Sequence, residues 1–433
     1  MATAPTVAVI GGGYAGMAAA VALAAQKINV TVFEAGKVPG GRARRVEHEG
    51  TALDNGLHIL SGAYSETLRL IALVNPQHAS LLLRVPLAWH MHGEFDLVAP
   101  RLPAPLHLLA ALITARGGRL GDRLQMARML AALRRRHWRL DRDISVEQLL
   151  AQYRQSEFMQ RVFWRPLCVA ALNTPPALAS AQIFLNVLRD TMNAERAASD
   201  LLLARVDLSA LFPEPAARFV AEHGGRVELG TRITGIATSS GAYTLTTGEN
   251  QRPFSHVICA LPPHQVGAFL SGIPALAETT AMLDAFSYQP IYSVWLQYAA
   301  PVALPSPMLG FADGPLHWLF DRGALCGQSG LIGAVISAEG EHQSLTQDEL
   351  GALAQAEIAR RLGPLPDLRW TRVIAEKRAT FACTPGLQRP STVTPLKNFY
   401  LAGDYTASDY PATIESAVRS GIDCATRIAA QRA

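Results

Sequence analysis

The sequence has little charge, little cysteine and no long apolar run, and each shortage excludes a class of protein. Charged residues make up 17% of the 433 residues and the net charge is only +4, so we expect no nucleic-acid partner. The five cysteines are scattered, odd in number and without a C-x-x-C pair, which indicates neither a disulfide framework nor a metal site and fits a cytoplasmic protein. No uncharged apolar run reaches the roughly 18 residues of a membrane-spanning helix, so any membrane contact is expected to be peripheral.

Two motifs are also missing. There is no D-D-x-x-D run to bind the magnesium that prenyl diphosphate chemistry needs, so a prenyl substrate is expected to be free of diphosphate. A second G-x-G-x-x-G turn is absent as well, so we expect no separate NAD(P)H domain and an external electron donor. The composition is 49% hydrophobic, and a chain of this length is expected to form two intertwined domains that can enclose a large cofactor.

A glycine-rich turn near the N-terminus predicts a Rossmann-type dinucleotide fold. The apolar run Thr6–Ile10 ends in GGGYAG, and an alanine-rich stretch at residues 17–25 follows, which is the order of strand, turn and helix. The spacing places Gly11 at the tight turn, Gly13 beside a pyrophosphate and Gly16 where the helix packs on the strand. The positive end of the helix would then face the phosphates.

The next strand and its loop select the cofactor. Residues Asn29–Phe33 are predicted to be a strand, and Glu34 follows where an acid can reach a ribose hydroxyl, which favours FAD or NAD over NADP. The segment Gly40-Gly41-Arg42 then adds a second glycine pair and a guanidinium that can bind pyrophosphate or ribityl oxygens. NAD dehydrogenases lack such a segment, so the sequence predicts FAD.

A second cofactor segment lies near the C-terminus. Residues 398–402 are predicted to be a strand that leads into Gly403 and Asp404, and Asp404 can accept a hydrogen bond from a ribityl hydroxyl. The last helix is expected to open at residues 411–417, with its positive end toward the flavin pyrimidine edge. The full predicted cofactor set is Gly11, Gly13, Ala15, Gly16, Glu34, Ala35, Gly40, Gly41, Arg42, Val227, Gly403, Asp404, Ala412, Thr413 and Ile414.

The middle of the chain contributes further strands, predicted at residues 225–229, 231–236, 243–247 and 256–260. This insert is expected to bring the backbone near Val227 to the adenine. The fold class is therefore α/β, with a discontinuous FAD-binding domain and an α+β substrate domain. The predicted boundaries are 1–85, 211–270 and 381–433 for the FAD-binding domain, and 86–210 and 271–380 for the substrate-binding domain.

Taken together, these motifs identify a family. GGGYAG, Glu34, GGRARR, DNGLHILSGAY and LAGDYT resemble the amine oxidase and phytoene desaturase superfamily, and these segments specify only FAD. The middle segments PAPLHLL, PLCVAALNTPP and SDLLLARVDLSALFPEPAARF are similar to the hydroxysqualene dehydroxylase family of squalene and hopanoid biosynthesis. The resemblance covers essentially the whole chain. It implies a hydrophobic polyisoprenoid substrate, hydroxysqualene, whose hydroxyl is removed reductively to give squalene.

Such a reaction needs a proton donor for the leaving oxygen, a dry apolar tunnel and aromatic faces that tolerate a cation. The candidate catalytic residues lie in two segments expected to meet near the flavin: Asp54, His58 and Tyr64, and then Asp409 and Tyr410. His58 ranks first because an ordinary histidine pKa near 6.5 allows donation at neutral pH. Its alternative role is a hydrogen bond to backbone or flavin, and Asp54 is expected to hold its loop through backbone N–H groups.

The segment 101–142 carries ten arginines against Asp122 and Asp141, and these arginines alternate with leucine, methionine and alanine. Helical spacing gives it an arginine face and an aliphatic face, which is typical of a helix that lies at a membrane surface. We therefore expect peripheral contact with the inner face of the cell membrane. The alternative is a solvated helix face of the substrate domain.

Three other functions fit parts of the pattern. A carotenoid or polyisoprenoid desaturase would use oxidised FAD on the same substrate class, and sequence separates it poorly. An amine oxidase would need an aromatic cage at the flavin, and none can be assigned. A non-catalytic prenyl-binding escort shares the fold without binding FAD, as guanine-nucleotide dissociation inhibitors do, but here Arg42 and the Gly403-Asp404 pair are both present.

Overall fold

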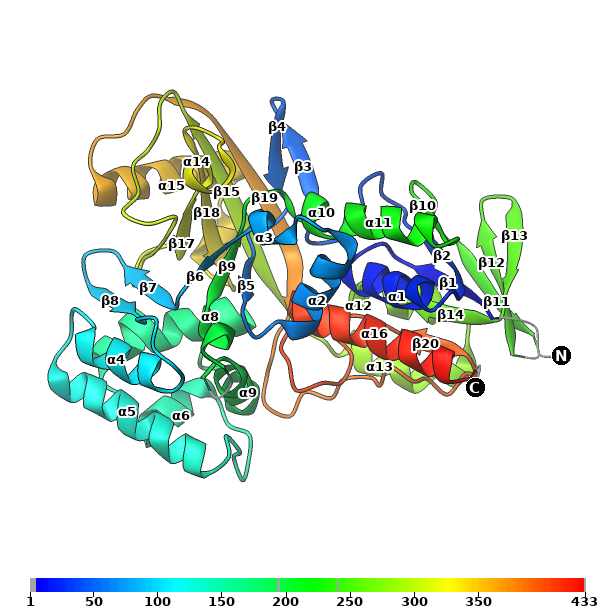
Figure 1. Cartoon of the computed structure of the whole chain (residues 1–433), viewed down its shortest axis with the longest axis horizontal. Helices are drawn as coiled ribbons and strands as arrows, with labels where there is room; N and C mark the ends of the chain where they lie inside the picture. The colour runs from blue at the N-terminus through cyan, green and yellow to red at the C-terminus, as the bar shows by residue number, and fades with distance from the viewer. Residues whose placement is uncertain (1–4, 193–194, 240, 432–433) are drawn as a thin grey trace.

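The computed structural model describes residues 5–192, 195–239 and 241–431, and its central element is a parallel sheet (Figure 1). Within the described residues this sheet has five strands in the order β10-β2-β1-β14-β20. Their bounds are β10 Arg226–Glu228, β2 Asn29–Phe33, β1 Thr6–Ile10, β14 His256–Cys259 and β20 Phe399–Leu401. The strands come from both ends and the middle of the chain, and β1, β2, β14 and β20 are almost entirely buried, as parallel sheets are. The predicted α/β fold is confirmed.

Helices cover one face of this sheet and a small antiparallel sheet covers the other. Helix α1 (Tyr14–Ala25) packs against α16 (Ile414–Ala430) and α11 (Pro213–Glu222). On the other face lies a meander of β11 (Gly235–Ser239), β12 (Ala242–Thr247) and β13 (Asn250–Phe254). Its Phe254 ring meets Phe33 of β2 edge-on at 5.8 Å.

The contact between α1 and α16 is unusually close. A Cβ built on Gly421 of α16 would lie 2.1 Å from the carbonyl oxygen of Ala15, so only glycine permits this approach. Helix α1 is apolar on all sides and almost wholly buried, which suits a helix enclosed by others. The first helix and the last helix of the chain are thereby joined directly.

A larger mixed sheet forms the other half of the molecule. Its seven described strands run in the order β19-β15-β18-β17-β16-β7-β8, and α15 (Gln347–Leu362) packs against β15 and β19. Strand bounds are β7 Ala88–Met91, β8 Phe95–Val98, β15 Tyr288–Tyr298, β16 Met308–Gly310, β17 Trp318–Asp321, β18 Leu331–Ser337 and β19 Leu368–Phe381. The long strands β15 and β19 extend back toward the cofactor half, where Tyr288 pairs with Phe381 (Figure 1).

A helical layer lies beside this sheet, at the lower left of Figure 1. It consists of α4 (Leu106–Thr114), α5 (Leu120–Arg135), α6 (Val146–Gln152), α8 (Arg165–Leu172) and α9 (Ala181–Met192), with a π-helical turn at Gln160–Trp164. The Trp89 indole donates to the carbonyl of Val162 in that turn and so ties the layer to the sheet. No helix among the residues described is long and apolar enough to cross a membrane.

The remaining elements connect the two halves. One small sheet joins β5 (Ile59–Ser61), β9 (Leu201–Ala204) and β6 (Leu82–Val85), and a hairpin joins β3 (Arg45–His48) to β4 (Thr51–Asp54). The other short helices are α2 Ser65–Val74, α3 His78–Leu81, α7 Glu157–Met159, α10 Leu208–Leu211, α12 Pro263–Leu270, α13 Ala277–Asp284 and α14 Arg322–Cys326. Strand β9 belongs to the predicted substrate domain and pairs with strands of the FAD-binding domain. The predicted domain boundaries stay a prediction.

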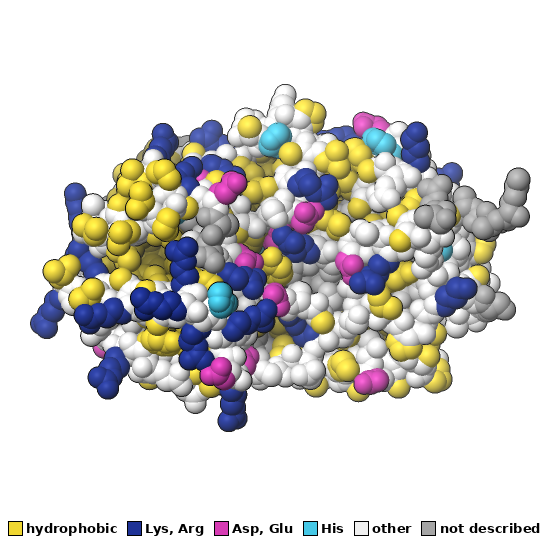
Figure 2. Space-filling model, turned by 60° about the horizontal axis from the view of Figure 1, so that its bottom comes forward, with side chains coloured by type: hydrophobic (Ala, Val, Ile, Leu, Met, Phe, Trp, Pro, Cys, Tyr) yellow, Lys and Arg dark blue, Asp and Glu magenta, His cyan; other side chains and the backbone are white. Residues whose placement is uncertain are grey.

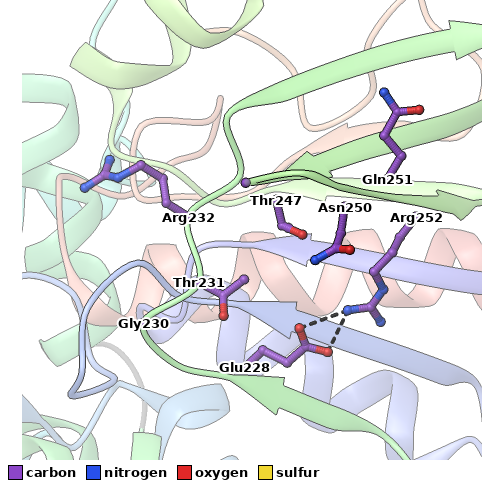
Figure 3. A pocket seen from close by; sticks show the side chains of 9 residues that line it. Glu228, Gly230, Thr231, Arg232, Thr247, Asn250, Gln251 and Arg252 are labelled. Atoms are coloured by element: carbon purple, nitrogen blue, oxygen red, sulfur yellow. Dashed lines mark hydrogen bonds and ion pairs between the residues drawn. The ribbon is translucent and has the colours of Figure 1, made fainter.

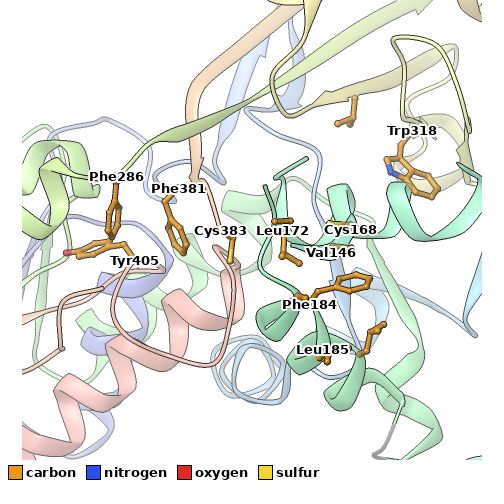
Figure 4. Packing of buried hydrophobic residues seen from close by; sticks show 14 of the residues in the cluster. Val146, Cys168, Leu172, Phe184, Leu185, Phe286, Trp318, Phe381, Cys383 and Tyr405 are labelled. Carbon is orange, nitrogen blue, oxygen red and sulfur yellow. The ribbon is translucent and has the colours of Figure 1, made fainter. Parts of the chain in front are cut away.

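Figure 4 shows that one hydrophobic core runs between the halves. Phe286, Phe381 and Tyr405 lie at its cofactor end, and Leu172 and Phe184 come from the helical layer. Because the same cluster spans both halves, they share one packed interior.

Two details of the predicted elements are wrong, and a third is sharpened. The strand predicted at 231–236 starts only at Gly235, because the Thr231 N–H donates to the Glu34 carbonyl and holds this stretch as a loop. Strand β13 was not predicted, since NQRPF lacks the alternation of a half-buried strand. The last helix begins at Ile414, within the predicted segment 411–417, where the Thr413 hydroxyl accepts from the Ser416 N–H and caps it.

Candidate functional site

Two positions of the N-terminal glycine turn, Gly11 and Gly16, admit no side chain. Gly11 has a φ of +111°, and a Cβ there would lie 2.6 Å from the Ala260 carbonyl oxygen. A Cβ on Gly16 would lie 2.0 Å from the Gly11 carbonyl oxygen. Gly13 precedes α1 and gives it no side-chain cap, so the first N–H groups of α1 are left for a ligand.

The second glycine pair lies directly against the first turn. Gly40 and Gly41 have φ values of +125° and +61°, and the Gly40 N–H donates to the Gly12 carbonyl at 2.9 Å. A Cβ on Gly41 would lie 3.2 Å from the Gly13 Cα. The two segments predicted to bind pyrophosphate therefore form one continuous backbone surface.

Glu34 stands at the end of β2 and organises the same turns. Its carboxylate accepts 2.7 Å hydrogen bonds from the N–H groups of Gly12 and Gly36, and Ala35 is exposed beside it. Val227 of β10 pairs with Val32 of β2 in the neighbouring strand. The structure thus brings the predicted ribose and adenine contacts to the same sheet end.

Arg42 and Asp404 are joined to each other. Arg42 Nη2 donates to Asp404 Oδ1 at 2.6 Å, and Nη1 donates to the Ala379 carbonyl at 2.6 Å. The side chain of Asp404 is 6% exposed and that of Arg42 is 31% exposed. Burial opposes the positive charge, but the Asp404 carboxylate outweighs it and raises the pKa of Arg42. Two predicted cofactor residues from opposite chain ends are therefore a single charged unit.

The start of α16 lies beside one of the candidate acids. Burial and the nearby Glu415 raise the pKa of Tyr64 far above its ordinary range, although the neighbouring Thr413 side chain lowers it. Tyr64 is therefore a neutral phenol at any physiological pH. Ala412 and Ile414 flank Thr413 at the positive end of this helix.

These segments fit FAD. Two glycine turns, an uncapped helix N-terminus, an acid at the sheet end and a half-buried Arg–Asp pair supply the donors and acceptors of a dinucleotide site. The hydroxyls of Tyr288 and Tyr405 are buried without a hydrogen-bond partner in the described part of the chain. Tyr405 immediately follows Asp404, so a polar cofactor group beside this pair would give its hydroxyl a partner.

His58 and Asp54 face the same small cavity. Its other lining residues, apart from Arg322, are apolar: Leu57, Leu203, Ala204, Leu208, Phe320 and Leu325. Asp54 is buried, with Oδ1 accepting from the Leu208 N–H at 2.8 Å and Oδ2 lying 3.5 Å from Arg322 Nη1. His58 Nδ1 lies 2.8 Å from the Gly56 carbonyl oxygen.

Burial shifts the pKa values of Asp54 and His58 in opposite directions. It raises the pKa of Asp54 to about 6, although Arg322 and the Leu208 N–H lower it. It lowers the pKa of His58, which the Gly56 hydrogen bond offsets only in part. His58 is thus a neutral imidazole at pH 7, so the ordinary pKa on which we ranked it first does not hold. The catalytic roles of both residues stay predictions.

Asp409 and Tyr410 lie apart from this cavity and face α9. Asp409 Oδ2 is 3.6 Å from Arg189 Nη1, and about half of the Asp409 side chain is exposed. Tyr410 interacts with Asp190, and Arg419 lies over its ring at 5.2 Å. The five predicted catalytic candidates are therefore not brought together at one point: Asp54 and His58 share the cavity, whereas Asp409 and Tyr410 face α9 and Tyr64 lies near Glu415.

Sequence reasoning missed Arg322. This arginine is 4% exposed, faces Asp54 and lies over the Trp295 ring at 5.6 Å. The only sequence signal was a lone arginine after three apolar residues and Asp321, whose carboxylate accepts from the Ala324 N–H at the start of α14.

A second, polar cleft opens at the edge of the cofactor half (Figure 3). It is lined by Glu228, Gly230, Thr231, Arg232, Thr247, Gly248, Asn250, Gln251 and Arg252. Arg252 Nη1 donates to both carboxylate oxygens of Glu228, at 2.7 and 2.9 Å. A cleft so lined does not suit a polyisoprenoid chain.

Comparison with known proteins agrees with this geometry. Residues 14–429 match the family described as "Flavin containing amine oxidoreductase". The chain is 30% identical to hydroxysqualene dehydroxylase of Rhodopseudomonas palustris over 96% of each chain, and 25% identical to a zeta-carotene desaturase of Zea mays over 96% of this chain and 82% of that one. The solved structure of an oxidoreductase from Methanosarcina mazei shares the fold, with a TM-score of 0.74, 13% identity and coverage of 98% and 100%.

Proposed function

The chain belongs to the flavin-containing amine oxidoreductase family and is an FAD-dependent oxidoreductase, and from this premise we propose that it reductively removes the hydroxyl of hydroxysqualene to give squalene. The full-length similarity to a hydroxysqualene dehydroxylase supports this substrate. The observation that carries the chemistry is the Asp54 carboxyl, whose pKa burial raises to about 6 and which lies with His58 among apolar side chains. The cavity that these residues line has a volume of about 10 Å³, so it must widen to admit the reacting carbon of the substrate.

In the proposed reaction the C–O bond of the alcohol breaks, its oxygen leaves as water, and a C–H bond forms at the same carbon. The balance is one alcohol, two electrons and two protons in, and one alkene product and one water out. Bound FAD, once reduced by an external donor, supplies the hydride. The glycine turns, Glu34, Arg42 and Asp404 would hold it.

The chain itself must protonate the leaving oxygen, since hydroxide is a poor leaving group. We assign this step to Asp54. Its buried carboxyl retains a proton to higher pH than an ordinary aspartate, and it faces the same cavity as Leu203 and Phe320. In the proposed reaction these apolar neighbours would keep water from the reacting carbon, where it would otherwise capture an allylic cation.

His58 has a supporting role in this scheme. Its Nδ1 is engaged with the Gly56 carbonyl, which leaves Nε2 as an acceptor in the neutral ring. An acceptor in the cavity can orient the substrate hydroxyl toward the carboxyl of Asp54.

The test is anaerobic incubation of the holoenzyme with hydroxysqualene and dithionite, with squalene measured by gas chromatography and mass spectrometry. We expect squalene in proportion to dithionite, and none when the donor is omitted. Absence of squalene from flavin-loaded protein would overturn the proposal.

A carotenoid-type desaturase is the second candidate, favoured by the similarity to the zeta-carotene desaturase. In that reaction hydride is transferred from the substrate to oxidised FAD. It therefore needs an electron acceptor that reoxidises the flavin, in place of an electron donor. Incubation of the oxidised holoenzyme with zeta-carotene and a quinone distinguishes the two, because desaturation lengthens the conjugated chromophore and shifts its absorption to longer wavelength.

A further inference from the structure

Helix α4 presents apolar side chains both to the protein and to solvent. His107 and Ala111 pack inward. Leu106, Leu109 and Ile113 are spaced three and four residues apart, so they share the opposite face, where they are 53%, 53% and 67% exposed. A surface helix ordinarily carries polar side chains on its outer face, so this face lacks the partner that its composition requires.

The apolar surface continues on both sides of α4. Among the described residues, twelve large hydrophobic side chains are exposed, and seven of them fall within residues 98–124, so the exposure is concentrated in one segment. We call these seven residues the α4 face: Val98, Leu102, Leu106, Leu109, Ile113, Leu120 and Leu124. Leu120, at the start of α5, is 77% exposed.

Arginines border the α4 face. Along α5 the outward stripe that begins with Leu120 and Leu124 continues with Arg128 and Arg135, since these residues are four or seven apart. Arg128, Arg134 and Arg135 have no acidic partner within the described ranges. Figure 2 shows hydrophobic side chains gathered at one end of the molecule with many basic side chains beside them.

The two acidic residues of segment 101–142 already have partners within that segment. Asp122 accepts from the Arg119 N–H at the start of α5, and Asp141 pairs with Arg136 at 2.5 Å. The positive charge on this side of the molecule is therefore not neutralised from within the segment. A partner of opposite charge with an apolar layer would satisfy both features.

We propose that the α4 face docks on a lipid bilayer with anionic headgroups. The aliphatic side chains of α4 would enter the acyl boundary while the arginines of α5 contact headgroup phosphates. A second copy of the chain fits less well, because a symmetric contact through the α4 face would bring two unneutralised arginine clusters together. This contact is independent of the proposed reaction, and binding without turnover tests it.

The experiment is flotation of the holoenzyme with vesicles of phosphatidylcholine alone or with phosphatidylglycerol added. We expect flotation with the anionic vesicles at low salt and release at high salt. Ile113→Asp and Leu109→Asp should remain in the soluble fraction. Arg128→Gln and Arg135→Gln should each weaken binding about fivefold.

Matched controls lie elsewhere on the surface. Leu345→Asp changes another exposed leucine and Arg218→Gln another exposed arginine, and both should float like the wild type. Each variant is checked for bound flavin and for an unchanged thermal transition. Since Ile113 is mostly exposed, its substitution leaves the core intact.

Three results would overturn the proposal. Wild type that stays soluble with anionic vesicles at low salt excludes bilayer docking. Equal flotation of the α4 variants and the wild type places the lipid contact elsewhere. A concentration-dependent dimer that Ile113→Asp dissociates, without vesicle binding, makes the α4 face a contact between two copies of the chain.

Discussion

Arg42 and Asp404 are 362 positions apart in the chain, and Arg42 Nη2 donates to Asp404 Oδ1 at 2.6 Å. Arg42 follows the second glycine pair, and Asp404 follows β20. Arg42 also donates to the Ala379 carbonyl in β19, the strand that extends from the larger sheet. One guanidinium therefore joins the N-terminal and C-terminal cofactor segments to the substrate half.

Replacing Arg42 should weaken flavin binding. In Arg42→Met the Asp404 carboxylate remains buried without its partner, and hydrogen bonds to charged groups contribute about 1.5–3 kcal/mol each. We expect the Kd for FAD to rise at least about tenfold, as measured by fluorescence titration of apoprotein. Arg69→Met removes an exposed pair with Glu66 and should leave the Kd unchanged. An unaltered Kd in Arg42→Met would refute the assignment.

The close contact of α1 and α16 makes Gly421→Ala destabilising. The new Cβ would lie 2.1 Å from the Ala15 carbonyl, so the helices must move apart, at a cost of about 1–3 kcal/mol in unfolding free energy. Gly121→Ala in α5 is the matched control, because a Cβ there meets nothing within 4 Å. Helix propensity should stabilise that variant by up to about 1 kcal/mol. Guanidinium chloride titration measures both values, and equal midpoints would contradict the prediction.

The pH dependence of turnover should report Asp54. A proton donor acts only when protonated, and burial raises the pKa of this carboxyl to about 6. We therefore expect kcat/KM to be constant below that pH and to fall tenfold per unit above it. Asp54→Asn should lower kcat/KM by about 10²–10⁴-fold and abolish this limb. A limb that persists in Asp54→Asn would belong to another acid.

His58→Phe separates the two candidate donors. If Asp54 supplies the proton, the variant loses only an orienting group and its pH limb stays at the wild-type position. If His58 is the donor, squalene formation falls by orders of magnitude and the limb disappears. Retention of bound flavin confirms that the variant is folded.

Arg322 should set the pH at which kcat/KM begins to fall. Its guanidinium lies 3.5 Å from Asp54 and lowers the pKa of that carboxyl, so Arg322→Met removes the charge that favours the ionised form. We expect the kcat/KM limb to move to higher pH. A shift to lower pH, or no shift with wild-type flavin content, would show that Arg322 does not act on Asp54.

The cofactor fold was predictable because its signals are local. The bounds of β1 and β2 match the predicted strands, and the glycine turn after β1 could be read residue by residue. Glu34 also stands where the spacing indicated. Such features depend on backbone geometry within a few residues, which a sequence specifies directly.

The candidate site was only partly predictable because its chemistry depends on distant segments. The environment of Asp54 is set by Leu208 of α10 and Arg322 of α14, neither of which is near it in sequence. The sequence ranks His58 ahead of Asp54 as the proton donor. The structure reverses this order, because burial lowers the pKa of His58 and raises that of Asp54. Composition and spacing carry no information about such contacts.

The placement of β20 and α16 against β14 and α1 has a consequence for biosynthesis. Domains generally fold as units while the chain leaves the ribosome, N-terminal parts first. Here β1 and α1 cannot complete their surroundings until β20 and α16, far later in the chain, have emerged. Until α16 has emerged, the apolar surface of α1 lacks this cover, and chaperone engagement of that helix during synthesis is the expected result.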